Sequence, residues 1–340
     1  AAANGRKPLA DVVSYNTIIK GFARSNLQQC FQCLQEMTSN GIDPDDITWG
    51  TLLDACLVDR QLDTAAKLID MLLADGRPMD GTMCALFIKG LARAGCVDKA
   101  LELLGAMRRR GGACPDLVTY TYLIKALVDR HELDGAMMLL EEMRRAGHKS
   151  DDIVITHLLE GCRHACNHQL GKRLFAELLR DGIKPSEFTL VSMLKLHGRC
   201  GAHAEAFEMV QGWEKAHGTK PSVIHYTCLM SGCIRTRSFA QAWAAYELMC
   251  QNGVEPDAMM LSTLLPAMVS AQRWDAVAEL AAKATANGRS AVPAEHLNSA
   301  LAQMKAAGSH GRHLESLRAC MQAAGVAVTA RQGAREPALR

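Results

Sequence analysis

The sequence has few aromatic residues, little net charge and no long apolar run. Aromatic side chains make up 5% of the 340 residues, which argues against a β-sandwich and against a platform of stacked aromatic rings. The formal net charge is only +2, so any basic surface for nucleic acid must be local. No apolar stretch reaches the roughly 18–20 residues that a bilayer crossing requires, and the sequence predicts no membrane span.

Motifs for catalysis and for a disulfide framework are also missing. The 13 cysteines are odd in number and evenly spread, unlike those of short secreted proteins, and this distribution predicts a reducing compartment. Neither a glycine-rich phosphate loop nor a convincing arrangement around a nucleophile is present. The sequence therefore predicts a chain that is not an enzyme and that needs no cofactor.

The two ends of the chain lack the pattern of its middle. The chain begins with Ala-Ala-Ala rather than Met, so we expect residues 1–11 to be the remnant of a longer protein whose N-terminus and any targeting peptide are missing. Residues 330–340 have no periodicity and are expected to fray. The intervening residues 12–329 carry a repeat.

The repeat has a period of 35 or 36 residues, and two series of residues mark it. Glycines recur at this spacing: Gly41, Gly76, Gly111, Gly147, Gly182, Gly218, Gly253 and Gly288. A glycine just past a helix end can take the left-handed conformation of a C-cap, and most of these are soon followed by a helix-stopping proline. Mostly small residues keep the same phase: Cys30, Ala65, Ala100, Ala136, Gly171, Ala206, Ala242 and Val277. Small residues at a fixed place allow two helices to approach closely.

Each period is interpreted as a pair of helices. Leu101, Leu103, Leu104 and Met107 follow helical spacing, and no window of similar length alternates as a strand would. One pair cannot bury its apolar faces alone, so neighbouring pairs must stack into an all-α solenoid. The predicted units begin at Val12, Asp46, Gly81, Leu117, Asp152, Glu187, Val223, Ala258 and Ala294. The first eight are regular, and the degenerate ninth is expected to act as a cap.

Several segments resemble the pentatricopeptide repeat. VVSYNTIIKGF (residues 12–22) and the segments 117–127 and 223–233 are similar to its first helix. Segments 94–111 and 132–147 are similar to its second helix. The period of 35 and the terminal Pro-Asp separate these units from the tetratricopeptide repeat. The resemblance implies a right-handed α-solenoid that binds single-stranded RNA.

In this family the fifth residue of a repeat and its last residue contact one base. The resemblance implies Asn16 with Asp45 for uracil, Thr121 with Asp151 and Thr227 with Asp257 for guanine, and Thr156 with Ser186 for adenine. No base is assigned to the pair Ser262 with Val292. The pairs Gly50 with Asp80, Ala85 with Asp116, and Val191 with Ser222 lack a polar fifth side chain, and these repeats are predicted to be silent or to serve another purpose. The implied RNA is U-N-N-G-A-N-G, read 5′ to 3′.

The resemblance also implies base-wedging and phosphate-binding residues. An apolar second residue wedges between bases: Val13, Ile47, Val118, Ile153, Phe188, Ile224 and Met259, with Thr82 as the exception. A cation near the end of the first helix faces phosphate: Arg24, Arg93, Arg199 and Arg235. His164 takes the same place, whereas Asp129 breaks the row. The alternative is a cation that only stabilises the helix dipole, by about 0.3–1 kcal/mol.

Two groups of cysteine and histidine residues are candidate metal ligands. Cys30 and Cys33 form a CxxC pair, which supplies half of the four ligands of a structural zinc site. Cys30 also falls on the small packing position of its repeat, which favours packing. A denser group, in which two or three ligands could converge, comprises Cys162, His164, Cys166 and His168. Ordinary filling of repeat positions explains both groups, and no metal site is predicted.

Two functions remain open at this point. The resemblance implies an adaptor in a mitochondrion or plastid that binds single-stranded RNA and assists its stabilisation, processing or translation. Nothing after Ala294 supplies the His-x-Glu and Cys-x-x-Cys motifs of an RNA-editing deaminase domain, and no aspartate-rich nuclease domain is present. The alternative is a structural subunit of an organellar ribosome or another large complex, which contacts rRNA or protein by shape. The silent positions and the low net charge favour this alternative.

Overall fold

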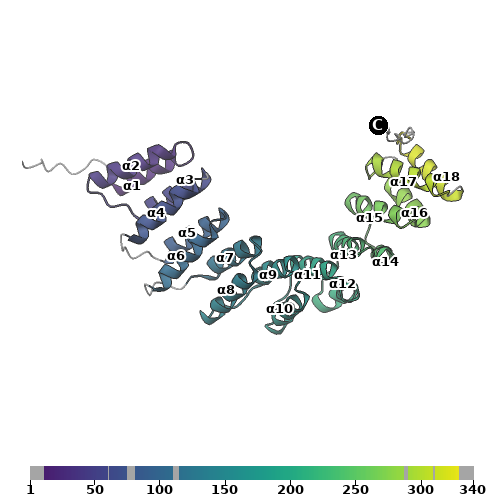
Figure 1. Cartoon of the computed structure of the whole chain (residues 1–340), viewed down its shortest axis with the longest axis horizontal. Coiled ribbons are helices and arrows are strands. Elements are labelled where there is room, and N and C mark those ends of the chain that lie inside the picture. The colour runs from purple at the N-terminus through teal and green to yellow at the C-terminus, as the bar shows by residue number, and fades with distance from the viewer. Residues whose placement is uncertain are drawn as a thin grey trace, which may run out of the picture. The chain divides into compact units, whose positions relative to one another are not determined.

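Figure 1 shows the computed structural model of the chain, which describes residues 11–59, 61–74, 81–109, 115–286, 290–308 and 311–328. These residues form eighteen α-helices and contain no strand. The first helices of the pairs are α1 (Val12–Phe22), α3 (Asp46–Val58), α5 (Gly81–Arg93), α7 (Leu117–Asp129), α9 (Asp152–His164), α11 (Glu187–Cys200), α13 (Val223–Arg235), α15 (Ala258–Ser270) and α17 (Ala294–Ala306). The second helices are α2 (Leu27–Ser39), α4 (Leu62–Ala74), α6 (Val97–Arg109), α8 (Leu133–Arg145), α10 (His168–Arg180), α12 (His203–His217), α14 (Phe239–Gln251), α16 (Trp274–Thr285) and α18 (Arg312–Ala323). The predicted all-α repeat fold is confirmed.

The first helices begin at the nine residues where the sequence pattern places its units. The residue before the helix fixes this start in six cases, because its side chain accepts a hydrogen bond from the backbone N–H of the third helical residue. These N-cap residues are Asp11, Asp45, Asp116, Asp151, Ser186 and Asp257. The last residue of one repeat is therefore the N-cap of the next repeat's first helix.

The glycine series ends second helices, as the sequence predicts. Gly41 has a φ of +73°, which only glycine adopts without strain. Its N–H donates to the Thr38 carbonyl and the N–H of Ile42 donates to the Met37 carbonyl, which closes the end of α2. Positive φ also occurs at Gly147, Gly182, Gly218 and Gly253. Three members of the series, Gly76, Gly111 and Gly288, lie outside the described residues, as do residues 1–10 and 329–340.

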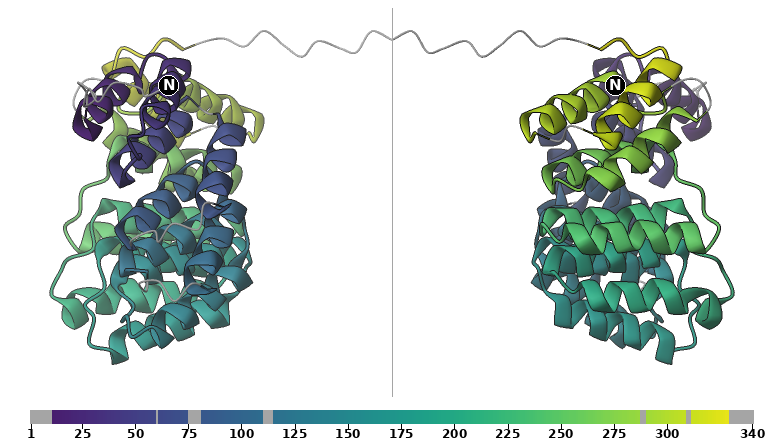
Figure 2. Two further views of the ribbon diagram at one scale, coloured as in Figure 1. Left: turned by 90° about the vertical axis from the view of Figure 1, so that its left-hand side faces the viewer. Right: turned by 90° about the vertical axis from the view of Figure 1, so that its right-hand side faces the viewer.

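The helices belong to two compact units, residues 1–165 and residues 166–340. In the first unit, each first helix from α1 to α7 packs on the first helix of the following repeat, so that the series ends at α9. Each of α1, α3, α5 and α7 also packs on the second helix of its own repeat. The same arrangement links α11, α13, α15 and α17 in the second unit. Figure 2 shows the helix pairs of each unit from two further sides. Within a unit, residues at the same repeat position therefore lie on neighbouring first helices.

The small-residue series lies in the core of these helix pairs. All eight members, from Cys30 to Val277, are buried. Trp49, Trp213 and Trp243 are buried as well, and Trp274 packs against the core of the second unit. None of the described helices has the length and apolarity that crossing a bilayer would require.

Two glycines allow a close contact between α11 and α13 in the second unit. A Cβ atom added at Gly198 would lie 2.7 Å from the Gly232 Cα, and one added at Gly232 would lie 2.8 Å from the Gly198 Cα. Both distances are shorter than any normal contact, and both would be to backbone, which cannot rotate away. The spacing between these two first helices therefore depends on the absence of a side chain at both positions.

Candidate nucleic-acid interface

The seven predicted wedge residues are exposed apolar side chains. Each is the second residue of a first helix, and their exposed fractions lie between 53% and 77%. The described residues contain fourteen exposed large apolar side chains in all, and these seven make up half of them. Single exposed apolar residues are common on protein surfaces, but a recurrence in one repeat position calls for a specific reason. Thr82, the predicted exception, has a side chain outside the described part of the structure.

The predicted base-reading residues occupy two kinds of position. The fifth residues lie in the second turn of their first helices, and all of them are half-buried: Asn16, Thr121, Thr156, Thr227 and Ser262. Of their partners, Asp45, Asp151, Ser186 and Asp257 are N-caps. The N-cap bond uses only part of each side chain's hydrogen-bonding capacity, so a structural role and a recognition role are compatible.

Asn16 and Asp45 are brought together, as the resemblance implies. Asn16 Nδ2 donates to Asp45 Oδ1 over 2.9 Å. Thr48 Oγ1 lies 2.6 Å from Asn16 Oδ1 and 2.8 Å from Asp45 Oδ1, so its hydroxyl can donate to either. Because a carboxylate only accepts, the amide nitrogen of Asn16 must face Asp45. The network fixes the orientation of the amide and leaves one N–H and one carbonyl lone pair of Asn16 for a ligand.

Asp45 is held in its ionised form by the same network. Partial burial acts to raise the pKa of this carboxyl, but the hydrogen bonds from Asn16 and Thr48 outweigh burial and lower the pKa below its usual value. The role of the buried Thr48 was missed at the sequence level. The signal for it is the Asp45-x-x-Thr48 capping box at the start of α3.

Thr121 and Thr227 present acceptors rather than donors. Thr121 Oγ1 donates its hydrogen to the Leu117 carbonyl at 2.8 Å, and Thr227 Oγ1 donates to the Val223 carbonyl at the same distance. A threonine that has donated its only hydrogen can still accept from a ligand through its oxygen. Each of these first helices therefore offers a hydroxyl acceptor at the fifth position.

Two repeats near the C-terminus are less suited to base reading. Val292, the partner of Ser262, is 4% exposed, and a buried alkyl group cannot contact a base edge. In the ninth unit the fifth residue is Asn298, whose amide nitrogen donates to the carbonyls of Ala294 and Ala327. Both amide hydrogens of Asn298 are thus used within the protein.

The four predicted phosphate-binding arginines are exposed at the ends of first helices. Arg93 and Arg235 are the last residues of α5 and α13, Arg199 is the next to last of α11, and Arg24 follows α1 by two residues. Among the described residues, no carboxylate pairs with any of the four. Position and exposure fit both phosphate binding and the helix-dipole alternative, and binding experiments have to distinguish the two.

Four lysines on the same helices were missed at the sequence level. Lys20, Lys89, Lys125 and Lys195 are the ninth residues of their repeats, four after the base-reading position and four before the arginine position. Residues four apart share a helix face, so the fifth, ninth and thirteenth residues form one line along the first helix. Asp129 pairs with Lys125 over 2.7 Å, which neutralises the fourth repeat. Aligning the repeats by position would have revealed the lysine series.

Cys30 packs in the core. It is fully buried, and its thiol donates to the Ile19 carbonyl over 3.6 Å. Burial, with the neighbouring Cys33, raises the pKa of Cys30, which favours the protonated thiol over the thiolate that a metal requires. This environment is that of a packing residue.

Family models match most of the regions in which the repeat was identified. The model described as the PPR repeat family matches residues 10–58, 83–129 and 115–164. The pentatricopeptide repeat domain matches residues 214–271, and the PPR repeat matches residues 47–77. Together these matches cover more than half of the chain. The chain belongs to the pentatricopeptide-repeat family.

Curated relatives include pentatricopeptide repeat-containing proteins of Arabidopsis thaliana. A chloroplastic pentatricopeptide repeat-containing protein is 24% identical over 268 residues, which are 78% of this chain and 29% of the relative. Another chloroplastic member is 26% identical over 294 residues, which are 85% of this chain and 38% of the relative. The chain thus spans about a third of the length of these relatives.

The pentatricopeptide-repeat fold is also found in a solved structure. The crystal structure of the pentatricopeptide repeat protein PPR10 from maize matches 93% of this chain and 44% of its own, with a TM-score of 0.68 and 22% identity. At this level of identity the likeness establishes the fold. The function has to be argued from the side chains described above.

Proposed function

We propose that this chain binds single-stranded RNA along the surface formed by its first helices. The observation that carries the proposal is the series of seven exposed apolar residues at the second position of the repeat. An exposed apolar side chain gains by covering a flat, partly apolar partner, and the face of every base is such a partner. The same helices carry acceptors and cations in line, which match base edges and phosphates.

Truncation of a wedge residue should separate binding from folding. Phe188, the most exposed of the seven at 77%, contributes little to the core. We expect Phe188→Ala to weaken RNA binding by about 1–3 kcal/mol, the range of base–aromatic stacking, without lowering the thermal midpoint. Fluorescence anisotropy with a labelled RNA and thermal melts followed by circular dichroism measure the two effects.

The control for this prediction is Met138→Ala. Met138 is also exposed, at 74%, but it lies on the second helix α8. The Met138→Ala substitution should leave the RNA affinity unchanged. Equal losses from Phe188→Ala and Met138→Ala would mean that general apolar surface, and not the second repeat position, determines binding.

The hydrogen-bonding groups at the fifth position support the proposed base preferences. The free groups of Asn16 are a donor beside an acceptor, which matches the N3–H and a carbonyl oxygen of uracil. Thr121 offers an acceptor, and the carboxylate oxygens of Asp151 are acceptors as well. Guanine has two adjacent donors on its Watson–Crick edge, N1–H and the N2 amino group, and therefore fits a pair of acceptors. The assignment of Thr156 with Ser186 to adenine stays a prediction.

This chemistry predicts a change of specificity at one base. Thr121→Asn would recreate in the fourth repeat the Asn–Asp combination of the first. We expect the preferred base at that position to change from guanine to uracil, with a discrimination of about 1–3 kcal/mol. The matched control is Thr121→Val, which keeps the shape, removes the acceptor and should abolish the preference without creating a new one. Retention of guanine by Thr121→Asn would exclude reading by this residue.

The positions of the cations suggest that some repeats bind the RNA backbone and others read bases. The first, third and sixth repeats carry both a ninth-position lysine and a thirteenth-position arginine: Lys20 with Arg24, Lys89 with Arg93, and Lys195 with Arg199. The third and sixth are two of the repeats without a polar fifth residue, because Ala85 and Val191 stand there. We propose that these two repeats hold the RNA backbone, while the first, fourth, fifth and seventh read bases.

We place the proposed function in an organelle, since relatives of this chain are described as chloroplastic. Both a plastid and a mitochondrion are compatible with the residues, which carry no organelle-specific feature. The role proposed there is that of an adaptor, which shields an RNA segment and keeps it single-stranded for stabilisation, processing or translation. No catalytic step belongs to this proposal.

Selection from a randomised single-stranded RNA pool, repeated at several salt concentrations, tests the proposal as a whole. We expect enrichment of a motif with U followed by G-A-x-G at the predicted spacing. Weak binding at low salt without any enriched motif would contradict the RNA adaptor. The alternative, a structural subunit of an organellar ribosome or another large complex, would then be favoured, as the apolar or missing side chains at Gly50, Ala85 and Val191 would suggest.

A further inference from the structure

Three side chains that can bind metal meet in the second unit, away from the line of fifth, ninth and thirteenth positions. His168 begins α10, His197 lies in the last turn of α11, and Glu205 lies in the first turn of α12. His168 Nε2 is 2.8 Å from His197 Nδ1 and 3.7 Å from Glu205 Oε2. One ligand atom from each residue lies within 4.8 Å of the other two.

His197 is the buried member of this cluster. Its side chain is 2% exposed, and within the described residues its Nε2 has no hydrogen-bond partner. A metal ion bound by Nδ1, the ring atom nearest His168, would leave this Nε2 without a partner, so the proposed site rests on the convergence of the three side chains and not on this atom. Burial, followed by the neighbouring His168, lowers the pKa of His197 to about 4. The ring is therefore neutral at neutral pH, which is the form that binds metal ions.

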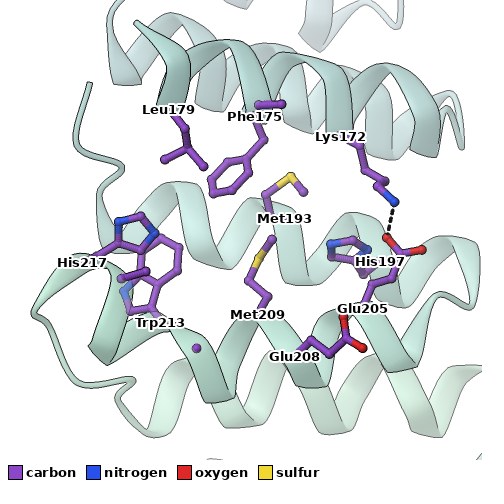
Figure 3. Close-up of a pocket in the computed structure, with 13 residues that line it drawn as sticks. Lys172, Phe175, Leu179, Met193, His197, Glu205, Glu208, Met209, Trp213 and His217 are labelled. Carbon is purple, nitrogen blue, oxygen red and sulfur yellow. Dashed lines mark ion pairs between the residues drawn. The ribbon is translucent and has the colours of Figure 1, made fainter. Parts of the chain in front are cut away.

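A cation already lies beside the carboxylate. Lys172 Nζ is 2.7 Å from Glu205 Oε2, and Figure 3 shows this ion pair next to His197. Both partners of the pair are partly exposed, at 45% and 41%, and an ion pair of this kind contributes only about 0.2–1 kcal/mol. The flexible Lys172 side chain can therefore leave, and a metal ion could replace its charge.

The cluster opens onto a cavity of about 540 Å³ between α10, α11 and α12. His197 and Glu205 line one end of it, and the remaining wall is largely apolar, with Phe175, Met209 and Trp213 pointing into the space (Figure 3). A cavity at this place gives room for a water molecule as a further ligand.

We propose that His168, His197 and Glu205 bind one divalent transition-metal ion of the zinc class. Two imidazoles and a carboxylate form a donor set that suits zinc and its first-row neighbours, whereas calcium and magnesium prefer oxygen alone. Zinc–ligand bonds of about 2.0–2.1 Å place tetrahedral ligand atoms roughly 3.3 Å apart. The observed 2.8 Å and 3.7 Å bracket this separation, and the atoms of the third pair, His197 and Glu205, lie within 4.8 Å of each other, so side-chain movements are needed to complete the site.

The site would connect consecutive repeats. Its ligands come from the second helix of the fifth repeat and from both helices of the sixth, which are separate elements joined by loops. A ligand that binds the folded form alone stabilises it, so the ion should raise the thermal midpoint of the second unit. This role is independent of RNA binding, and either proposal can fail without the other.

Calorimetric titration of the purified full chain with Zn²⁺, in a non-thiol reductant, tests the site. We expect one equivalent to bind, and binding to weaken at least about tenfold in His168→Ala and in Glu205→Gln. Both substituted residues are partly exposed, and circular dichroism verifies that each variant folds. The matched control is His313→Ala, because His313 and Asp275 form an exposed pair at 2.9 Å in the same unit, with no third ligand among the residues that the structure describes. This variant should bind Zn²⁺ like the wild type.

Two further measurements separate the site from the 13 cysteines of the chain. Co²⁺ bound by two imidazoles and a carboxylate shows visible absorption without the near-ultraviolet band of a cobalt–thiolate bond. Lys172→Ala should tighten Zn²⁺ binding by up to about fivefold, because no ammonium has to be displaced. A thiolate band, equal binding by the wild type and the His168→Ala/Glu205→Gln double variant, or no tightening by Lys172→Ala would each overturn the proposal.

Discussion

Substitution of Gly198 by alanine is expected to destabilise the second unit by about 1–3 kcal/mol, the usual cost of overpacking. The added Cβ would lie 2.7 Å from the Gly232 Cα, so α11 and α13 would have to move apart. The gain in helix propensity from glycine to alanine, up to about 1 kcal/mol, offsets only part of this loss. Gly232→Ala should have a similar effect, because its Cβ would meet the Gly198 Cα at 2.8 Å.

The matched control is Gly212→Ala on α12. Gly212 is an exposed helical glycine, and a Cβ there would meet nothing within 4 Å. This variant keeps the gain in propensity without the clash and should be stabilised by up to about 1 kcal/mol. Denaturant unfolding followed by circular dichroism measures both effects, and hydrogen exchange should show faster opening of α11 and α13 in Gly198→Ala. A stability of Gly198→Ala equal to that of Gly212→Ala would contradict the close contact.

The double variant Lys195→Ala/Arg199→Ala should weaken binding to every RNA sequence by about 5- to 30-fold, since each cation contributes roughly 0.5–1 kcal/mol. Each phosphate contact on single-stranded nucleic acid contributes about 0.7 to the slope of log affinity against log salt. Loss of two contacts should therefore reduce the magnitude of the slope by about 1.4. Anisotropy titrations at several salt concentrations, with two unrelated RNAs, measure both quantities.

The control for this variant removes the same charge elsewhere. Lys215 lies on the second helix α12 and Lys220 follows it in the connection to α13, so Lys215→Ala/Lys220→Ala removes two exposed cations outside the first helices. This control should change the slope little. If both double variants weaken binding equally, total charge and not the line of lysine and arginine positions governs affinity, and Arg199 is then better explained by the helix-dipole alternative.

The sequence by itself determined the repeat and most of its register. The N-cap residues, the C-cap glycines and the helical spacing of apolar residues are local signals. Each involves residues that are close in the sequence, so it can be recognised without the structure. They placed the starts of all nine first helices and identified the seven second-position residues that the structure shows to be exposed. The position of Asn16 beside Asp45 also follows from the repeat, because the family resemblance assigns both positions.

Only the tertiary structure decided which side chains from different helices meet. Thr48 orients Asn16, which lies 32 residues earlier in the sequence, and Gly198 contacts Gly232 of the following repeat. Neither pairing is encoded by a local sequence pattern. At the sequence level His168 was grouped with its neighbours Cys162 and His164. In the folded chain it meets His197 and Glu205, because stacking of helix pairs brings equivalent faces together irrespective of distance along the chain. A contact of this kind depends on how side chains fill the space between helices, and that space exists only in the folded protein.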